Sequence, residues 1–233
     1  MDLGNIHLYT GGFVPGYRTD AVMREERKVC GNRPMILSET GWHNANNSTA
    51  THYHTPEDVA GVYAPRLLLE CFIRRVPKIA IFELLDEWPD PGLTNHEAHF
   101  GMLRHDFSPK PAFVALANLA AIARRASGPG TAVGPGLEMT VLRGPADLRF
   151  ALVAVPGAAY LLYVWRSLAS IWDPIKRRRV DPGVVTAEFQ WAKPWAIRRY
   201  VPAKSASVAS SSTSRRTAVA LGADLQVLEF RPA

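Results

Sequence analysis

The sequence predicts an α/β protein in which parallel strand–helix units are followed by a region of antiparallel strands. Up to about residue 127, short apolar runs alternate with helical patterns, which is the order of βα units around a parallel sheet. Residues 127–136, SGPGTAVGPG, are rich in glycine and proline and are typical of a linker. Beyond them, apolar runs separated by turn residues indicate a small antiparallel β-sandwich.

The predicted elements of the first region come in the order that βα units require. Apolar runs cover residues 3–9, 35–39 and 78–85, a polar and charged stretch lies before Arg33, and helical patterns cover residues 56–75 and 111–125. The last helix has apolar residues at helical spacing, and Pro111 suits its first turn. In the earlier helix Pro65 has no backbone donor, so we expect a break or a kink there.

In the second region the predicted strands cover residues 147–155, 159–166, 184–191, 196–201, 217–221 and 225–230. Turn signals stand between them, among them Pro156-Gly157, Asp181-Pro182-Gly183 and Gly222-Ala223-Asp224. The Ser-rich stretch 205–214 is expected to be a flexible surface loop, and the basic run 176–179 the solvated tip of a hairpin. We therefore expect two domains, at residues 1–127 and 137–233.

Composition limits the class of protein. The chain has 233 residues, 47% of them hydrophobic, which is enough for one sizeable core or two modest ones. Lys and Arg exceed Asp and Glu by 27 to 21, but the excess is dispersed and no recognition motif accompanies it, which argues against a nucleic-acid-binding protein. Cys30 and Cys71 fit no metal or redox spacing.

Targeting signals are not recognisable in the sequence. The start, MDLGNIHLY, lacks the basic segment and apolar core of a signal peptide, and no apolar run reaches the roughly 18 residues of a membrane span. If Met1 is the true start, nothing here exports the protein, and the compartment stays open. We expect no membrane partner.

Acidic and aromatic residues gather where the three apolar runs of the first region end. His7 and Tyr9 close the first run, Glu39 closes the second and is followed by Trp42 and His43, and Glu83, Asp86, Glu87 and Trp88 close or follow the third. The carboxyl ends of parallel strands meet at one edge of a sheet, so these side chains share a rim. Cleavage of a glycosidic bond needs two carboxyl groups beside the bond and aromatic faces for the sugar rings. The rim supplies many of these groups.

Three segments, GNIHLYTGG, MILSETGWH and IFELLDEWPDPGLTNHEAHFGMLRHDFSPKPAFVALANL, resemble the last third of a clan A glycoside hydrolase. The likeness covers about residues 1–127 and implies a partial (β/α)8 TIM barrel that comprises strands six to eight. It places Glu39 at the nucleophile, His7 and Tyr9 on strand six near that nucleophile, and Glu83 and Trp88 on and after strand eight, where sugar contacts are usual. The following β-region resembles, less specifically, the accessory sandwich often appended to such barrels.

The resemblance implies a retaining glycosidase that acts on carbohydrate without a cofactor or a metal. Glu39 would attack the anomeric carbon, an upstream Glu would act as acid and base, and Trp42 and Trp88 would serve as sugar platforms. Strands one to five and the acid/base Glu have no counterpart in this sequence. We therefore expect the chain to be the C-terminal part of a longer enzyme, with weak or no turnover alone. Glu83, on the strand beside Glu39, is a weaker candidate for the acid.

Other interpretations stay open. The chain could be a non-catalytic carbohydrate-binding protein, or an interaction module whose half-barrel edges dock onto a partner chain. Glu39 could simply cap a turn, His7 and Tyr9 could be core residues, and Trp42 and Trp88 could only cover the barrel mouth. Glu83 could pair with Arg104 or Arg74. The segment with His96, His99 and His105 lacks metal-site spacing and is expected to be a polar loop.

Overall fold

The computed structural model describes residues 2–50, 52–129, 137–156 and 159–233. Contacts divide the chain into two compact units: Met1–Val114 with Ser170–Asp181, and Ala115–Ala169 with Pro182–Ala233. Residues 130–136 of the predicted linker, and Gly157 of a predicted turn, lie outside the described residues. The domain boundaries drawn from the sequence, 1–127 and 137–233, stay a prediction.

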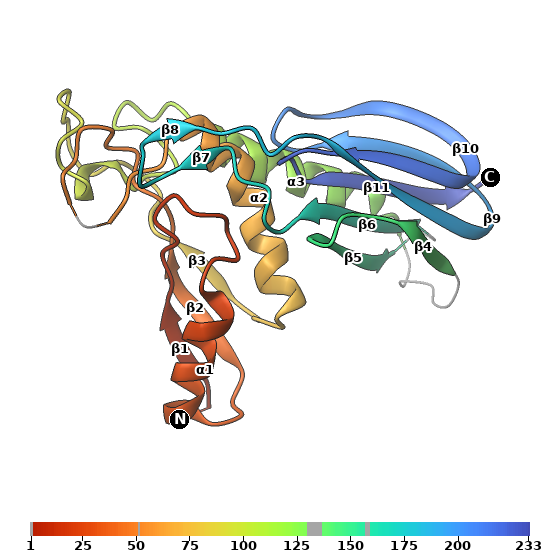
Figure 1. Ribbon diagram of the computed structural model, residues 1–233, viewed down its shortest axis with the longest axis horizontal. Helices are drawn as coiled ribbons and strands as arrows, with labels where there is room; N and C mark the ends of the chain where they lie inside the picture. Colours follow the sequence, from red (N-terminus) through yellow and green to blue (C-terminus); the bar gives the residue numbers. More distant parts are fainter. Residues whose placement is uncertain (1, 51, 130–136, 157–158) are drawn as a thin grey trace. The chain divides into compact units, whose positions relative to one another are not determined.

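A three-stranded parallel sheet forms the centre of the first unit (Figure 1). Its strands lie in the order β1 (Gly4–His7), β2 (Met35–Thr40) and β3 (Ile79–Ile81). Each predicted apolar run has become a strand, although β3 is shorter than the run 78–85. Helix α1 (Thr19–Cys30) forms in the stretch predicted only as polar and charged, and α2 (Glu57–Ile73) follows β2. The mixed α/β class is thereby confirmed.

Helix α1 packs closely against the sheet, and much of helix α2 is buried. A Cβ added at Gly4 of β1 would meet Cys30 Sγ of α1 at 2.7 Å, so the helix rests directly on the strand. Of the two expectations for α2, a break is wrong, because the helix runs through Pro65 without interruption, and a kink stays a prediction. Tyr63, Ala64 and Leu67, on both sides of the proline, are buried, and this packing stabilises the helix against the missing backbone donor.

A short hairpin, β7 (Trp172–Asp173) with β8 (Arg178–Arg179), also belongs to the first unit. Lys176 and Arg177 lie in its turn, as the prediction of a hairpin tip requires. Strand β8, by contrast, also makes side-chain contacts within the unit. Arg179 Nη2 lies 2.5 Å from Asp58 Oδ1, and its guanidinium stands 5.7 Å from the centre of the Trp172 ring.

The second unit is built on one six-stranded antiparallel sheet, in the order β10-β9-β11-β6-β5 with β4 also paired to β9. The strands are β4 (Met139–Arg143), β5 (Leu148–Val155), β6 (Ala159–Arg166), β9 (Val185–Val201), β10 (Ser205–Leu221) and β11 (Gln226–Pro232). Most of helix α3 (Pro111–Ala126) belongs to this unit. It is tied to the sheet through Asn118, whose Nδ2 donates to Pro202 O at 2.9 Å, and through the carbonyl of Ala126.

Strands β9 and β10 are much longer than the strands predicted for this region (Figure 1). The runs 184–191 and 196–201 are one strand, and residues 205–214 are not a loop but the first part of β10. That part pairs with β9, so the backbone groups of the serine run are satisfied by a neighbouring strand rather than by water. Serine side chains carry no apolar alternation, which is why the sequence hid the strand.

The long strands make the sheet fold over on itself. The first half of β9 pairs with β4 and its second half pairs with β11. Phe189 and Trp191 from the first half and Ile197 from the second enter the same apolar core, together with Phe230 of β11. A core enclosed between two parts of one continuous sheet takes the place of the two separate sheets of a simple sandwich.

Candidate functional site

Backbone contacts align the ends of the three parallel strands. Leu8 N donates to Glu39 O at 3.0 Å, and Phe82 N donates to Thr40 O at 2.7 Å. Gly41 is needed beside this contact, since a Cβ there would lie 2.1 Å from Phe82 O. The alignment brings Tyr9, Glu39 and Glu83 to the same edge of the sheet.

Glu39 is held through one of its two carboxylate oxygens. Tyr9 OH donates to Oε2 at 3.1 Å, and His7 Nδ1 lies 3.2 Å from the same atom. Within the described part of the chain, nothing hydrogen-bonds to Oε1. The side chain is 38% exposed, so this oxygen has access to a ligand while its partner is anchored.

Tyr9 is a persistent donor to that carboxylate. Burial, and then the hydrogen bond and the negative charge of Glu39, raise the pKa of the phenol well above its usual range. The hydroxyl therefore keeps its proton over the whole physiological pH range, and Oε2 remains an acceptor in this pair.

A cleft of about 420 Å³ opens beside Glu39. It is lined by Tyr9, Glu39, His52, Phe82, His96, Glu97 and Phe100. Two of these residues, Tyr9 and Glu39, are among the predicted site residues. The others come from the loops after β2 and β3, and the segment containing His96 was expected to be a polar loop without a role in the site. A neighbouring hollow of about 540 Å³ shares Tyr9 and His52 with the cleft and is also lined by His7.

The wall of the cleft is a set of packed rings. Tyr9 meets His52 edge to face, with centroids 5.2 Å apart, and His52 stacks on Phe100 at 5.7 Å. The Phe82 ring meets the Phe100 ring edge to face, with centroids 5.5 Å apart. Such ring contacts hold the loops in one arrangement around the carboxylate.

His43 lies behind this wall and supports it. The ring is fully buried, and its Nε2 is 2.6 Å from His52 O, which can only accept, so Nε2 carries the proton. Burial lowers the pKa of His43 to about 4. The ring is therefore neutral near pH 7.

Glu83 stands apart from the cationic partners that the sequence suggested for it. Arg104 instead pairs with Glu57, 2.5 Å away, and Arg74 pairs with Asp20 and Glu70. Oε1 of Glu83 is buried and has no hydrogen-bond partner among the described residues. Burial, and then the charges of Glu87 and Asp86, raise the pKa of this carboxyl.

The two tryptophans predicted as sugar platforms do not line the cleft. Trp42 is 5% exposed, and its Nε1 donates to Thr10 Oγ1 at 3.1 Å. Trp88 is 40% exposed on the loop after β3. A contact of either ring with sugar stays a prediction.

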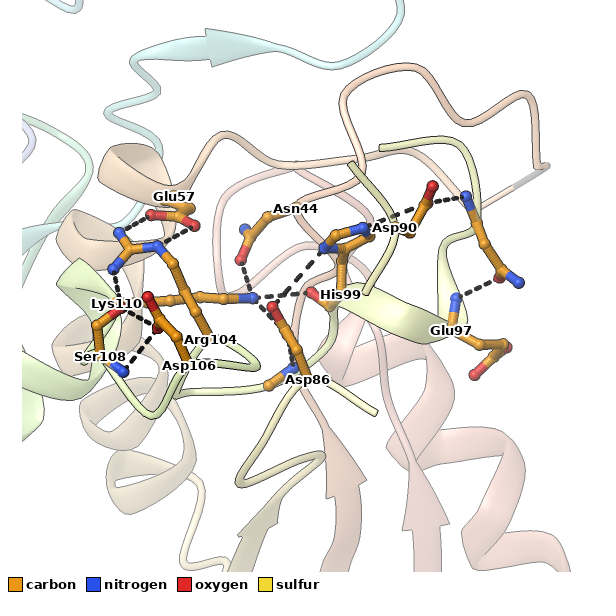
Figure 2. Close-up of polar contacts among 12 residues, drawn as sticks. Asn44, Glu57, Asp86, Asp90, Glu97, His99, Arg104, Asp106, Ser108 and Lys110 are labelled. Carbon is orange, nitrogen blue, oxygen red and sulfur yellow. Dashed lines mark hydrogen bonds and ion pairs between the residues drawn. The ribbon is translucent and has the colours of Figure 1, made fainter. Parts of the chain in front are cut away.

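A buried ionic network anchors the loop that carries Glu97 (Figure 2). Lys110 Nζ donates to Asp86 Oδ1 at 2.7 Å, to Asn44 Oδ1 at 3.1 Å and to His99 O at 3.2 Å. Asp86 Oδ1 also accepts from Gly101 N at 2.9 Å. His99 then continues the network, since its Nδ1 lies 3.7 Å from Asp86 Oδ2.

On the other side of His99 the network reaches the short helical turn η1 (Glu97–His99). His99 Nε2 lies 3.3 Å from Asp90 Oδ2, and that oxygen accepts from the backbone of Thr94 and Asn95. Asn95 Oδ1 in turn accepts from Glu97 N at 3.1 Å. Figure 2 shows this chain of contacts from Lys110 to Glu97, and Glu97 lines the cleft.

Nowhere in the described ranges do three or more His, Cys, Asp or Glu side chains gather as a metal site would require. His96 Nε2 instead lies 3.0 Å from Glu97 Oε1. Among the helices in the described ranges, none combines the length and apolar content needed to cross a bilayer.

Comparison with known proteins shows what the fold resembles. No family model and no curated protein matches the sequence. A family 39 glycoside hydrolase from Bacteroides cellulosilyticus WH2 is similar in structure, with a TM-score of 0.59 and 16% identity over 97% of this chain and 44% of that one. A glucosidase from Croceicoccus marinus has a TM-score of 0.58 and 13% identity over 100% of this chain and 55% of its own.

The chain has a glycoside-hydrolase-like fold. It spans about half the length of these two similar proteins.

Proposed function

We propose that this chain is the C-terminal part of a retaining glycosidase of clan A, with Glu39 as the nucleophile. Strands β1, β2 and β3 would be strands six to eight of a (β/α)8 barrel, and residues 137–233 an accessory β-domain. The observation that carries the proposal is the anchoring of Glu39: His7 and Tyr9 hold Oε2, while Oε1 has no hydrogen-bond partner in the described part of the chain, and the residue lines a cleft.

In the proposed reaction, Oε1 of Glu39 attacks the anomeric carbon of a bound sugar and the glycosidic C–O bond breaks. The leaving oxygen takes a proton from a second carboxyl group, and a covalent glycosyl-enzyme forms. Water activated by the same second group then attacks the anomeric carbon and releases Glu39. Tyr9 and His7 are positioning residues, because they fix the plane of the carboxylate through its other oxygen.

The second carboxyl group is proposed to lie outside this chain. In a retaining enzyme the two carboxyl groups are about 5 to 5.5 Å apart, on opposite sides of the scissile bond. Glu83 lies two residues after the end of β3, the strand adjacent to β2, rather than across a barrel from Glu39, and Glu97 Oε1 lies 3.0 Å from His96 Nε2. The span of about half of the similar glycosidases leaves room for the missing group in a longer enzyme.

Covalent labelling tests this role without the missing acid. A 2,4-dinitrophenyl 2-deoxy-2-fluoro-glycoside carries a leaving group that departs without protonation, so a nucleophile alone can be glycosylated. We expect a panel of such pyranosides to include one that adds a single fluorosugar to this chain. Peptide mass spectrometry should place it on Glu39.

Two variants serve as controls for the labelling. Glu39→Gln should abolish it, whereas Glu97→Gln, in the same cleft, should retain it. A label on another residue, or on Glu39→Gln, would overturn the assignment. Glycan binding without any label across the panel would instead favour a non-catalytic carbohydrate-binding protein.

A further inference from the structure

The second unit carries a groove of about 410 Å³ on strands β9 and β10. It is lined by Ile197, Arg199, Ser210, Ser212, Thr213, Ser214, Arg216, Thr217, Ala218 and Leu228. All of these residues belong to the second unit, and none takes part in the Glu39 cleft. Nothing in the proposed glycosidase mechanism uses them.

Strand register places one guanidinium among hydroxyl and apolar side chains. Arg199 of β9 is opposite Ser210 of β10 on one side and Leu228 of β11 on the other, and Ile197 is opposite Ser212. Residues directly opposite across antiparallel strands share a face of the sheet. Arg199 therefore has an apolar floor and a row of hydroxyl groups beside it.

Among the residues that the structure describes, Arg199 has no partner for its charge. Its Nε is buried without a hydrogen bond, and within the described ranges its guanidinium makes no ion pair. A buried cationic donor that lacks an acceptor is costly unless something supplies one. The second guanidinium of the groove, Arg216, uses its Nε for Gln190 at 3.2 Å and has no carboxylate partner among the described residues.

The charge of this segment is of one sign. From residue 189 to residue 223 the sequence has no Asp or Glu, but has Lys193, Arg198, Arg199, Lys204, Arg215 and Arg216. The groove thus contains two guanidinium groups, those of Arg199 and Arg216, without a carboxylate partner among the described residues, in a segment that has no acidic residue. Both features call for an anionic ligand.

We propose that this groove binds an acidic polysaccharide through the carboxylates of its uronate units. The planar fork of a guanidinium matches a carboxylate in two parallel hydrogen bonds. Serine and threonine hydroxyls both donate and accept, as recognition of sugar hydroxyls requires. The described lining has no aromatic ring, so it offers no platform on which nucleic-acid bases could stack.

Binding of tetragalacturonate to the whole chain, measured by titration calorimetry at low salt, tests the proposal. Arg199→Gln and Arg216→Gln should each weaken binding about tenfold, because each removes a charge-assisted pair. The matched control is Arg198→Gln, which removes the same charge from the neighbouring position of β9 but does not line the groove. It should change the affinity less than about twofold.

Comparison ligands distinguish the proposal from its competitors. Fully methyl-esterified tetragalacturonate should bind at least about tenfold more weakly, because its carboxylates are neutral. Equal binding of the ester, or an equal loss with Arg198→Gln, would overturn the proposal. Tighter binding to duplex DNA or to phosphatidylglycerol vesicles would overturn it in favour of a general anion surface. Glu39→Gln should leave the affinity unchanged, so the outcome does not depend on the proposed hydrolysis.

Discussion

At the scale of single residues, the defining feature is that the two carboxylate oxygens of Glu39 differ in their contacts. Oε2 contacts Tyr9 and His7, whereas Oε1 has no hydrogen-bond partner among the described residues, and Glu39 lines the cleft. A carboxylate that attacks carbon must present one lone pair in a fixed direction, and anchoring the other oxygen achieves this. His43 contributes by packing against His52 and Phe100, two rings that line the cleft.

Removal of the Tyr9 hydroxyl should impair the proposed reaction. We expect Tyr9→Phe to lower kcat/KM of the intact enzyme by about 10- to 100-fold, since a hydrogen bond to a charged group is lost. The measurement is steady-state hydrolysis of an aryl glycoside. Tyr163→Phe, in β6 of the second unit, is the control and should retain full activity; equal rates for both variants and the unaltered enzyme would show that Tyr9 does not position Glu39.

Acid should destabilise the protein through His43. The pKa of its buried ring is about 4, below the ordinary value of 6.5, so between these values the unfolded chain binds a proton that the folded chain does not. The free energy of unfolding therefore falls as the pH decreases from 6.5 to 4, by up to about 3 kcal/mol.

Urea denaturation at several pH values checks this dependence. His43→Gln should flatten the decline between pH 6.5 and 4, whatever its effect on stability at pH 7. His105→Gln, which changes an exposed histidine, should keep the slope of the unaltered protein. If His43→Gln lost stability with decreasing pH as steeply as the unaltered protein and His105→Gln, the decline would have another origin than His43.

At the scale of elements, the site depends on a long loop between β3 and α3 that has little regular structure. Lys110, 2% exposed at the start of α3, ties this loop together through Asp86, Asn44 and the carbonyl of His99. Burial lowers the pKa of this ammonium, and Asp86 acts in the opposite direction. The network, rather than a strand or a helix, holds the wall of the cleft.

Removing the lysine alone should lower the free energy of unfolding more than removing the lysine together with the charge of Asp86. Lys110→Met leaves the buried carboxylate of Asp86 without its cation, so we expect a loss of about 3 to 5 kcal/mol in the free energy of unfolding. The double variant Lys110→Met/Asp86→Asn should recover part of this loss, because the uncompensated charge is gone.

Chemical denaturation of the single and double variants provides the measurement. Lys78→Met, at an exposed lysine, should change stability by less than about 0.5 kcal/mol. A double variant no more stable than Lys110→Met would show that charge balance at Asp86 is not what the lysine provides.

At the scale of the whole molecule, the chain combines a unit built on a parallel sheet, which carries the proposed site, with a second unit built on antiparallel strands. The parallel sheet has three strands, of which β1 and β3 are the edges. A closed barrel has no such edges, which agrees with the proposal that further strands belong to the complete enzyme.

The isolated chain should therefore be a poor catalyst. We expect its kcat for an unactivated alkyl glycoside to be at least about 100-fold below that of the enzyme extended by the missing βα units, because general acid catalysis typically contributes 10²- to 10⁴-fold. Assays of both forms, each with Glu39→Gln as its blank, provide the comparison. Full activity of the 233-residue chain that disappears in Glu39→Gln would show that the acid is within it.

Parts of the site are visible in the sequence because they lie on strands. Apolar runs locate β1 and β2, and the parallel order brings their last residues together, so Tyr9 and Glu39 could be placed at one edge. His52, Glu97 and Phe100 could not, because loop conformations depend on contacts with distant residues. The buried position of Trp42 is hidden for the same reason.

Hydrophobic periodicity by itself determined the α/β class, the three strand positions, the second and third helices and the place of Glu39, since a buried strand or helix face needs apolar residues at regular spacing. Only the tertiary structure decided that residues 205–214 form a strand, that α2 continues through Pro65, and which side chains line the two grooves. Those outcomes depend on pairing with β9, on packing around α2 and on the Lys110 network. Each is a contact with another segment of the chain, and the hydrophobic pattern of the segment itself does not record it.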